Sequence, residues 1–177
     1  RVTLEPQPAA TVAPLRDGPR GLEVLLLQRS AALVFAPGAW VFPGGRIDPA
    51  DHLRVADLAP RLAAVREAAE EAGLLLDPAS LVEVAHWTTP PGQVRRYATW
   101  FFVADANGCG GVRIDDVEAV DYRWLCPGDA LDAGRRGELH LIRPTVATLQ
   151  QLEHFADVAT ALAAFASQAT PRHSPDR

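Results

Sequence analysis

Lysine and methionine are absent from this chain of 177 residues, and cysteine occurs only twice. All 17 basic side chains are therefore arginines. The two cysteines, Cys109 and Cys126, do not have the spacing of a metal site or a redox pair, so we expect idle thiols in a reducing, cytoplasmic compartment. The chain begins at Arg1 and has no methionine, so we expect it to be a trimmed form of a longer chain.

Long apolar runs are absent too, since no stretch approaches the roughly 18 apolar residues of a membrane span. The net charge is −5, which gives no general attraction to nucleic acid or to an anionic membrane. The chain is 48% hydrophobic and 22% charged, as in an ordinary globular protein. We therefore expect a globular protein that has neither nucleic acid nor membrane as a partner.

The order of the predicted elements indicates a mixed α/β protein. Helical patterns cover residues 60–72, 127–134 and 144–167, and the last should form two helices that meet near residues 154–157. Residues 46–59 are polar and irregular. We predict one domain over 1–142, C-terminal helices over 143–167 that pack on it, and a loose tail over 168–177. Strand patterns cover residues 10–15, 22–29, 38–45, 80–89, 95–105 and 119–126.

Three glutamates crowd the end of the first predicted helix, in the stretch "REAAEEAG" from Arg66 to Gly73. Winding this helix at 3.6 residues per turn puts Glu67, Glu70 and Glu71 on one face, opposite a predicted core face. A solvated helix face is one interpretation. However, these like charges repel one another, and they lie at the helix end that already carries partial negative charge. A bound divalent cation such as Mg²⁺ or Mn²⁺ would explain the arrangement. The predicted core face consists of Leu62, Val65, Ala69 and Ala72.

A second unusual stretch, "FPGG" from Phe42 to Gly45, closes a predicted strand with two glycines. Glycine permits backbone conformations that are closed to other residues, and it lets main-chain groups approach a ligand closely. Alone, the pair could be an ordinary tight turn. Its position ahead of the glutamate helix makes the combination far more specific.

These residues resemble the signature of the Nudix hydrolases. The second half of that signature is present without a gap as "REAAEEAGL", from Arg66 to Leu74. The first half departs, because about seven residues are inserted between Gly45 and Arg66. The family's first glutamate corresponds to Asp51 when counted from Gly45, and to Leu58 when counted back from Arg66. Asp48 and Asp57 are nearby substitutes.

A further resemblance is to the coenzyme A pyrophosphatases of this family. The chain reads "LLLQRSAALVFAPGAWVFPGG" from Leu25 to Gly45, with the same spacing as their upstream pattern, although Leu27 replaces a threonine and Val34 replaces an arginine. The signature with its insertion between Gly45 and Arg66 is similar to that of the peroxisomal acyl-CoA and CoA diphosphatases and their bacterial relatives. The stretch "HWTTPPGQVRRYATWFF" from 86 to 102 is also similar to these proteins. The resemblance spans roughly residues 10–149.

The resemblance implies an α/β/α sandwich around a mixed sheet, with a catalytic loop–helix–loop. It implies metal-dependent hydrolysis of a diphosphate bond in a nucleoside diphosphate derivative, with CoA or acyl-CoA favoured. Glu67, Glu70 and Glu71 would bind Mg²⁺ or Mn²⁺, with Glu71 the most essential, and Gly44 or Gly45 could add a carbonyl ligand. Arg66 would orient the carboxylates.

The roles of the remaining candidate site residues are not decided by the sequence. Asp51, Asp115, Asp116 and Glu118 are candidates for the general base or for an extra ligand, although an ordinary polar loop would also explain the last three. Arg29 and the pair Arg95 and Arg96 could bind phosphates. Trp40, Phe42, Trp87 and Trp100 could contact the substrate, although large aromatic side chains are more often in the core.

Three alternatives also remain. An ADP-ribose or NADH pyrophosphatase would suit the loss of an arginine at Val34. A catalytically weak nucleotide-binding Nudix domain would suit the missing first glutamate. A Nudix-fold isomerase of allylic diphosphates would need a catalytic cysteine. The C-terminal helices could cover the sheet, shape an acyl pocket or form a homodimer contact.

Overall fold

The computed structural model describes residues 5–53, 58–93 and 95–174 of the chain. Within these residues, eight strands form one mixed sheet with the order β3-β2-β1-β6-β5-β8, in which β4 also pairs with β1 and β7 with β2. The chain neighbours β1 and β2 are antiparallel, whereas β1 and β6 are parallel. The strands are β1 Gln7–Gly18, β2 Gly21–Arg29, β3 Trp40–Val41, β4 Gly44–Arg46, β5 Val82–Thr88, β6 Tyr97–Asp105, β7 Ala119–Leu125 and β8 Arg172–His173.

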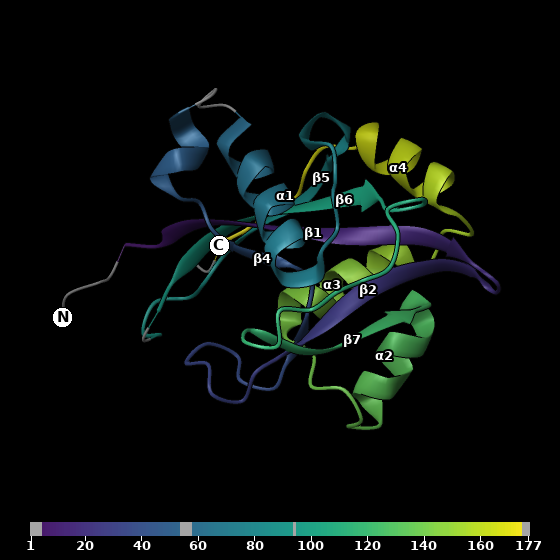
Figure 1. Ribbon diagram of the computed structural model, residues 1–177, viewed down its shortest axis with the longest axis horizontal. Coiled ribbons are helices and arrows are strands. Elements are labelled where there is room, and N and C mark those ends of the chain that lie inside the picture. Colours follow the sequence, from purple (N-terminus) through teal and green to yellow (C-terminus); the bar gives the residue numbers. More distant parts are fainter. Residues whose placement is uncertain (1–4, 54–57, 94, 175–177) are drawn as a thin grey trace.

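Helices cover both faces of the sheet, which gives the predicted α/β/α arrangement (Figure 1). One face packs against α1, mainly through alanines. The other face packs against α2, α3 and α4, which bury side chains in the largest core cluster together with β1, β2, β5 and β6. None of the described helices is long and apolar enough to cross a membrane. The helices are α1 Ala59–Ala72, α2 Pro127–Arg135, α3 Arg143–Leu152 and α4 Val158–Ala166, and short 3₁₀ turns cover Pro49–Leu53 and Pro78–Ser80.

The predicted strand over residues 38–45 is two short strands instead of one. β3 pairs with β2, where Val41 lies opposite Leu27, whereas β4 pairs with β1, where Gly44 lies opposite Thr11. Pro43 between them has no N–H to donate to a ladder, and its carbonyl accepts a hydrogen bond from the Val12 amide. The chain therefore changes its pairing partner from β2 to β1 at Phe42 and Pro43, just before the two glycines.

The glutamate helix forms almost as predicted. Helix α1 has a proline in its first turn and ends at Gly73, which adopts the left-handed conformation with φ 67°. Amides of Gly73 and Leu74 bond back to the carbonyls of Ala69 and Ala68. The predicted ends were therefore correct within one residue.

The predicted core face of α1 was right only in part, since Ala72 is buried and Val65 packs against the core at its margin. Leu62, Val65 and Ala69 are only half-buried, and of that set Ala72 alone is buried. The reason is that α1 packs on the sheet through small side chains, which let its backbone come close and turn Glu71 inward. The buried positions are Ala59, Ala63, Ala64, Ala68, Glu71 and Ala72.

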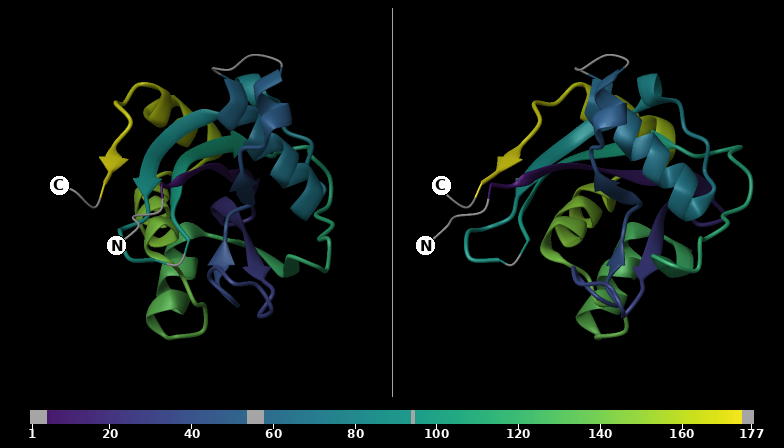
Figure 2. Two further views of the ribbon diagram at one scale, coloured as in Figure 1. Left: turned by 90° about the vertical axis from the view of Figure 1, so that its left-hand side faces the viewer. Right: turned by 60° about the vertical axis from the view of Figure 1, so that its left-hand side comes forward.

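The C-terminal segments also differ from the prediction in one respect. Helices α3 and α4 lie within the predicted helical region and contribute Leu149, Leu152 and Phe165 to the main core. The following segment is not a loose tail throughout, because Arg172–His173 pairs in parallel with β5 and extends the sheet by one strand. Figure 2 shows this last strand, coloured yellow, running along the outer edge of β5.

Candidate active site

The inner end of α1 carries an unusual carboxylate, Glu71. Its side chain is only 6% exposed, and its Oε1 atom has no hydrogen-bond partner among the described residues. Burial raises the pKa of Glu71 to about 8, and the nearby charges of Glu67 and Glu118 act in the same direction. Arg29 and a backbone hydrogen bond from Gly44 act in the opposite direction. An unpaired buried carboxylate is costly unless a ligand compensates for it.

The other two glutamates are held by Arg66. The guanidinium Nη1 lies 2.8 Å from Glu67 Oε1 and 3.4 Å from Glu70 Oε2. Burial is the main cause of the raised pKa of Glu67, and Arg66 opposes that shift. Glu70 remains exposed at 60%. The three glutamates therefore occupy three environments: Glu71 is buried, Glu67 is half-buried and Glu70 is solvated.

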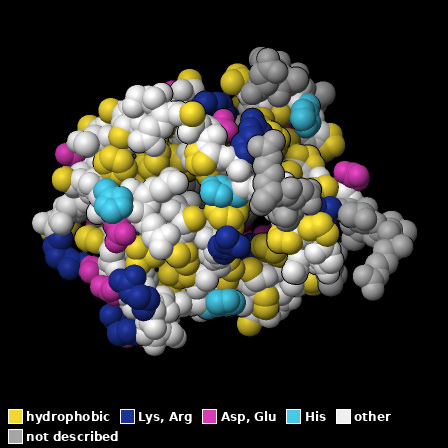
Figure 3. Space-filling view, turned by 180° about the vertical axis from the view of Figure 1, so that it is seen from behind, with side chains coloured by type: hydrophobic (Ala, Val, Ile, Leu, Met, Phe, Trp, Pro, Cys, Tyr) yellow, Lys and Arg dark blue, Asp and Glu magenta, His cyan; other side chains and the backbone are white. Residues whose placement is uncertain are grey.

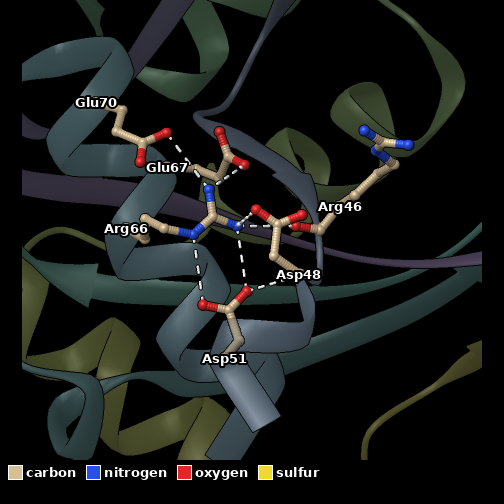
Figure 4. A network of polar contacts seen from close by, with 6 residues as sticks. All are labelled: Arg46, Asp48, Asp51, Arg66, Glu67 and Glu70. Atoms are coloured by element: carbon tan, nitrogen blue, oxygen red, sulfur yellow. Dashed lines mark hydrogen bonds and ion pairs between the residues drawn. The ribbon is translucent and has the colours of Figure 1, made fainter. Parts of the chain in front are cut away.

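The inserted segment after β4 supplies a second anchor for Arg66, namely Asp51. Asp51 is only 6% exposed, and its Oδ2 lies 3.2 Å from Arg66 Nη2. The same oxygen accepts a hydrogen bond from the Asp48 amide at 2.8 Å, which closes the 3₁₀ turn. Arg66 Nη2 also donates to the Arg46 carbonyl at 3.0 Å. Figure 4 shows the guanidinium enclosed between these groups and the carboxylates of α1.

Asp51 therefore reaches the signature helix α1 despite the insertion. It contacts the arginine of the signature and not the buried Glu71. Asp48 is a weaker neighbour, with Oδ2 3.5 Å from Arg66 Nη2 and a side chain that is 51% exposed. The third substitute, Asp57, lies outside the described residues.

The glycines of β4 allow the strand to approach α1 closely. A Cβ atom on Gly45 would lie 2.3 Å from Glu67 Oε1, and one on Gly44 would lie 2.3 Å from the Thr11 hydroxyl. Both distances are shorter than any normal contact, so neither position has room for a side chain. Gly45 thus lets the β4 backbone lie directly against Glu67, and Gly44 lets it lie against β1.

A small pocket connects Glu71 with two further charged residues. Arg29 reaches it from the end of β2, where its Nε donates to the Phe35 carbonyl at 3.0 Å. Glu118 reaches it from the loop before β7, which is joined to the end of β2 by a hydrogen bond from the Ser30 amide to the Glu118 carbonyl. The lining residues are Leu27, Gln28, Arg29, Val41, Glu71, Glu118 and Ala119.

Of the candidate bases after residue 114, only Glu118 lies in this pocket. Asp115 instead accepts hydrogen bonds from the amides of Val117, Glu118 and Ala119, so it shapes the loop. Asp116 is exposed and adopts a left-handed backbone with φ 59°. Sequence reasoning could not rank these three acids, because the ranking depends on how the loop turns.

Several predicted substrate contacts are placed elsewhere. Trp40 and Phe42 are 3% and 2% exposed and belong to the main core, so the prediction that they face a substrate was wrong. Both pack in the main core cluster, which also includes side chains of α2 and α3. Arg96 is also buried, and its Nε donates to the Thr89 carbonyl across the β5–β6 hairpin. Arg95 is exposed.

Sequence reasoning missed Phe35, which contacts Arg29 through its carbonyl. The Arg29 Cζ lies 6.0 Å from the centroid of the Phe35 ring, and that ring meets Tyr97 edge-on at 5.3 Å. No periodic signal marks a loop residue such as Phe35. The only sequence signal for a role of Phe35 is its position five residues after Arg29 and Ser30, which match the upstream pattern of the coenzyme A pyrophosphatases.

Within the described residues, no three acidic, histidine or cysteine side chains converge closely enough to hold a metal ion as they stand. The chemistry of the donor set nevertheless fits a hard divalent cation. Glu71 has a buried oxygen without a partner, and the Gly45 backbone lies against Glu67. Arg66 holds one oxygen each of Glu67 and Glu70. Carboxylate and carbonyl oxygens are the ligands that Mg²⁺ and Mn²⁺ prefer.

Comparison of the chain with known proteins identifies its family. The NUDIX domain model matches residues 5–144. The chain belongs to the Nudix hydrolase family. This Nudix chain is 26% identical to the acyl-coenzyme A diphosphatase NUDT19 of Homo sapiens over 248 residues, which cover 86% of the chain and 66% of that protein. It is 24% identical to the Xenopus laevis protein of the same name over 231 residues, which cover 77% of the chain and 61% of that protein.

This Nudix chain spans less than two thirds of the length of these curated relatives. Among solved structures, it superposes on a NUDIX hydrolase from Alicyclobacillus acidocaldarius with a TM-score of 0.84 and 26% identity, covering 96% of the chain and all of that protein. It also superposes on the NUDIX domain of Shewanella oneidensis NrtR, crystallised with ADP ribose, with a TM-score of 0.64 and 17% identity, covering 85% and 88% of the two chains. At that identity the second likeness concerns the fold alone.

Proposed function

We propose that this Nudix chain hydrolyses the diphosphate bond of a nucleoside diphosphate derivative with the help of Mg²⁺ or Mn²⁺. The observation that carries the proposal is Glu71, a buried carboxylate with an unpartnered oxygen beside Glu67 and Glu118. A carboxylate in this position is stabilised by a cation, and a diphosphate needs a cation because its own charge repels a nucleophilic water.

Each residue of the site would have one role. Glu71, Glu67 and Glu70 would hold the metal, together with a backbone carbonyl of Gly44 or Gly45. The metal would neutralise phosphate oxygens and lower the pKa of a bound water. Arg66, held by Asp51, would keep Glu67 and Glu70 oriented. Arg29 would offer a positive charge to a phosphate.

Glu118 is the candidate that we favour for the general base. It is exposed, so it can exchange protons with solvent, and it is close enough to Glu71 to raise that residue's pKa. In the reaction, the oxygen of water attacks one phosphorus, the bridging P–O bond breaks, and the other phosphate leaves with the bridging oxygen. The base accepts the proton that the water loses.

The substrate that we favour is CoA or an acyl-CoA, cut to 3′,5′-ADP and 4′-phosphopantetheine or its acyl form. Support comes from the spacing of residues 25–45 and from the names of the two diphosphatase relatives. An ADP-ribose or NADH-type substrate is the second candidate. It is favoured by Val34, which replaces an arginine of the pattern and is 69% exposed, and by the burial of Arg96.

The isomerase alternative has less support. Cys109 Sγ lies 3.6 Å from the Leu75 carbonyl, and Cys126 precedes the first turn of α2. Burial raises the pKa of the Cys109 thiol, which makes it a poorer nucleophile. The pocket beside Glu71 is lined by neither cysteine.

The test is to incubate the purified chain with CoA, dephospho-CoA, ADP-ribose and isopentenyl diphosphate, each with Mg²⁺, with Mn²⁺ and with a chelator, and to identify the products by mass. The proposal expects cleavage at the diphosphate of at least one nucleotide, only with metal. A clear preference for dephospho-CoA over CoA would favour the second candidate. Conversion of isopentenyl diphosphate to its isomer, or full activity in chelator, would contradict the proposal.

A further inference from the structure

Strand β7 has one edge to which no other strand of the described chain is bonded. It pairs with β2 alone among the described strands. Figure 1 shows β7 beside β2, on the side away from β1. A free strand edge presents backbone N–H and C=O groups that can pair with another chain. The strand has seven residues, whereas β8 at the opposite end of the sheet has two, so β7 offers a further strand the longer edge.

The backbone of Tyr122 faces this free edge. Its amide donates to the side chain of the preceding residue, at 2.8 Å from Asp121 Oδ1, and so does not take part in the ladder with β2. Alternate residues of an antiparallel strand bond to opposite sides, so the backbone of Trp124 faces the same way. A bulge at Val120 disturbs only the start of the strand. The regular part of β7 therefore presents the backbone groups of Tyr122 and Trp124 to a partner.

The side chains of β7 leave this edge accessible. Natural proteins protect free edges with lysine, proline, inward-pointing charges or bulges. The chain has no lysine and β7 has no proline, so only the bulge at its start limits the edge. Val120 is 44% exposed and Tyr122 is 39% exposed. The edge therefore combines unpaired backbone groups with apolar side chains in contact with solvent.

The charged side chains of β7 favour one register for pairing with a second copy. In an antiparallel pair about a two-fold axis, the same strand meets itself, and one residue lies opposite its own copy. With Asp121 on the axis two carboxylates face each other, and with Arg123 on the axis two guanidinium groups do. With Tyr122 on the axis, Asp121 of each copy lies opposite Arg123 of the other. Opposite charges stabilise a cross-strand pair and like charges destabilise it, so the register centred on Tyr122 is favoured.

The backbone agrees with this register. Tyr122 faces the free edge, so the two copies of Tyr122 would exchange their N–H and C=O bonds with each other. Asp121 and Arg123 would then form non-hydrogen-bonded pairs, in which the facing side chains lie closest together. The same register therefore satisfies both the backbone groups and the charges.

The surface of α2, which follows β7 in the chain, is polar. Arg135 forms an ion pair with Asp132, and Arg136 Nε lies 2.7 Å from Glu138 Oε1. Figure 3, the view from behind, shows basic and acidic side chains close together at the lower left of the molecule. These charges already have partners within the chain. They suit the solvated rim of an interface, whereas the apolar side chains of β7 suit its centre.

We propose that β7 pairs antiparallel with β7 of a second copy of this chain, with Tyr122 on the two-fold axis. The sheets of the two copies then form one continuous sheet. Asp121 and Arg123 make two reciprocal ion pairs on one face of it, and the two Tyr122 rings pack together on the other. This inference does not depend on the proposed function, because none of these residues lines the pocket beside Glu71.

The first test is analytical ultracentrifugation of the full chain between about 1 and 100 µM. We expect wild type to change from monomer to dimer as its concentration rises. Tyr122→Lys places two like charges on the axis, so the dissociation constant of the dimer should rise at least about tenfold. The matched control is Leu75→Lys, the same kind of change at a more exposed apolar residue outside β7. Its dissociation constant should stay within about twofold of wild type.

The second test exchanges the charges. Asp121→Arg alone, or Arg123→Asp alone, puts like charges opposite each other and should weaken the dimer about three- to tenfold. The double variant with both changes restores the opposite charges and should return to within about threefold of wild type. Arg123 Cζ also lies 4.8 Å from the centroid of the Trp40 ring, so the melting temperature of each variant is measured first.

If a charge variant does not fold, hydrogen exchange of the wild type replaces it. The amides of Tyr122 and Trp124 should exchange more slowly at about 100 µM than at about 1 µM, because the second copy covers them only in the dimer.

The inference is overturned if wild type stays monomeric up to about 100 µM, or if Tyr122→Lys and Leu75→Lys have the same dissociation constant. It is also overturned if the double charge variant is no tighter than the single ones, or if the amides of Tyr122 and Trp124 exchange equally fast at both concentrations. Each of these outcomes leaves the proposed function standing, because no residue of the glutamate site is changed.

Discussion

At the scale of single residues, Glu71 is held at a cost to stability. Its carboxylate is turned into the interior by a helix face of alanines, and one of its oxygens lacks a partner among the described residues. Burial and two neighbouring glutamates disfavour its charged form. Residues whose pKa is shifted in this way cluster at functional sites, where stability is given up for activity.

Glu71→Gln should therefore separate stability from activity. In chelator, the variant should melt at a higher temperature than wild type, because burial opposes the ionisation of Glu71 that the unfolded chain favours, whereas an amide of the same shape does not ionise in either state. With Mg²⁺ or Mn²⁺, its hydrolysis of the cleaved nucleotide should fall by several orders of magnitude. Thermal scans and steady-state kinetics measure both effects. A Glu71→Gln enzyme with near wild-type activity would show that Glu71 is not a ligand.

Asp51 should act through Arg66, as a positioning residue. Asp51→Asn keeps the shape but loses a charge-assisted contact to the guanidinium, so kcat should fall by about tenfold with little change in KM. The loss should be smaller than that of Glu71→Gln. Asp51→Glu should recover part of kcat, since it restores the charge. An equal loss in Asp51→Asn and Glu71→Gln would mean that Asp51 is itself a full member of the catalytic set.

Residue-level reasoning from sequence found the charged groups but not their environments. Helical spacing put Glu67, Glu70 and Glu71 on one face, and the family resemblance implied that Gly44 or Gly45 lies near them. The structure places the Gly45 backbone against Glu67. Sequence reasoning could not tell that Glu71 is buried while Glu70 is solvated, because a rotation of α1 by about one residue decides this. It also assigned Trp40 and Phe42 to the substrate, since a sequence does not show which face of a two-residue strand is inward.

At the scale of elements, the contact between β4 and α1 depends on the absence of a side chain. Gly45→Ala would place a methyl group 2.3 Å from Glu67 Oε1, so either the strand or the glutamate must move. We expect this variant to lose most of its activity and to melt at a lower temperature. Gly128→Ala is the matched control, because a Cβ there meets nothing within 4 Å. Similar activities in the two variants would show that the close approach is not needed.

The edge formed by β5 and β8 should respond to pH through His86. Burial lowers the pKa of His86, and the positive charge of Arg172 adds to that effect. The unfolded chain therefore binds a proton at His86 more readily than the folded chain does. Its contribution to stability is present above the unfolded pKa of about 6.5 and is lost as pH falls through the lower folded value.

Melting temperatures of wild type and His86→Asn, compared between pH 7.5 and pH 5, measure this effect. The wild type should lose more stability on acidification than the variant does, and the exposed His154→Asn should behave like the wild type. Parallel curves for wild type and His86→Asn would contradict the assignment.

Element boundaries were predictable where a residue type enforces them. Gly73 ends α1 because a left-handed residue is needed there, and the apolar stretches within residues 22–29 and 95–105 located β2 and β6. The division of residues 38–45 into β3 and β4 was not predictable, because it follows from β1 changing its neighbour along its length. The pairing of β8 was missed because two polar residues give no strand pattern.

At the scale of the whole molecule, the fold brings distant segments to one end of α1. The end of β2, the loop before β7, the β4 glycines and the inserted turn all meet around the glutamates, although they are up to about 90 residues apart in sequence. Ligand binding at this junction should stabilise the folded state by mass action. Because the parts of this junction are scattered along the chain, the family signature indicated the family and composition did not.

Added Mg²⁺ or Mn²⁺ should raise the melting temperature of the chelator-treated protein by several degrees, since a saturating ligand at 100 times its dissociation constant contributes about 2.7 kcal/mol. Metal-free samples at the same ionic strength control for the screening of charges by salt. Glu71→Gln should show a much smaller increase. An equal rise in wild type and Glu71→Gln would mean that the ion binds elsewhere.

The most direct measurement is product analysis of CoA hydrolysis by wild type and Glu71→Gln, with Mn²⁺ and with chelator. We predict 3′,5′-ADP and 4′-phosphopantetheine from the wild type with metal, and neither product from the other three reactions. If ADP-ribose is cleaved instead of CoA, again only by the wild type with metal, the chain is a metal-dependent diphosphatase with a different substrate. Equal product formation by wild type with chelator, or by Glu71→Gln with metal, would contradict the account.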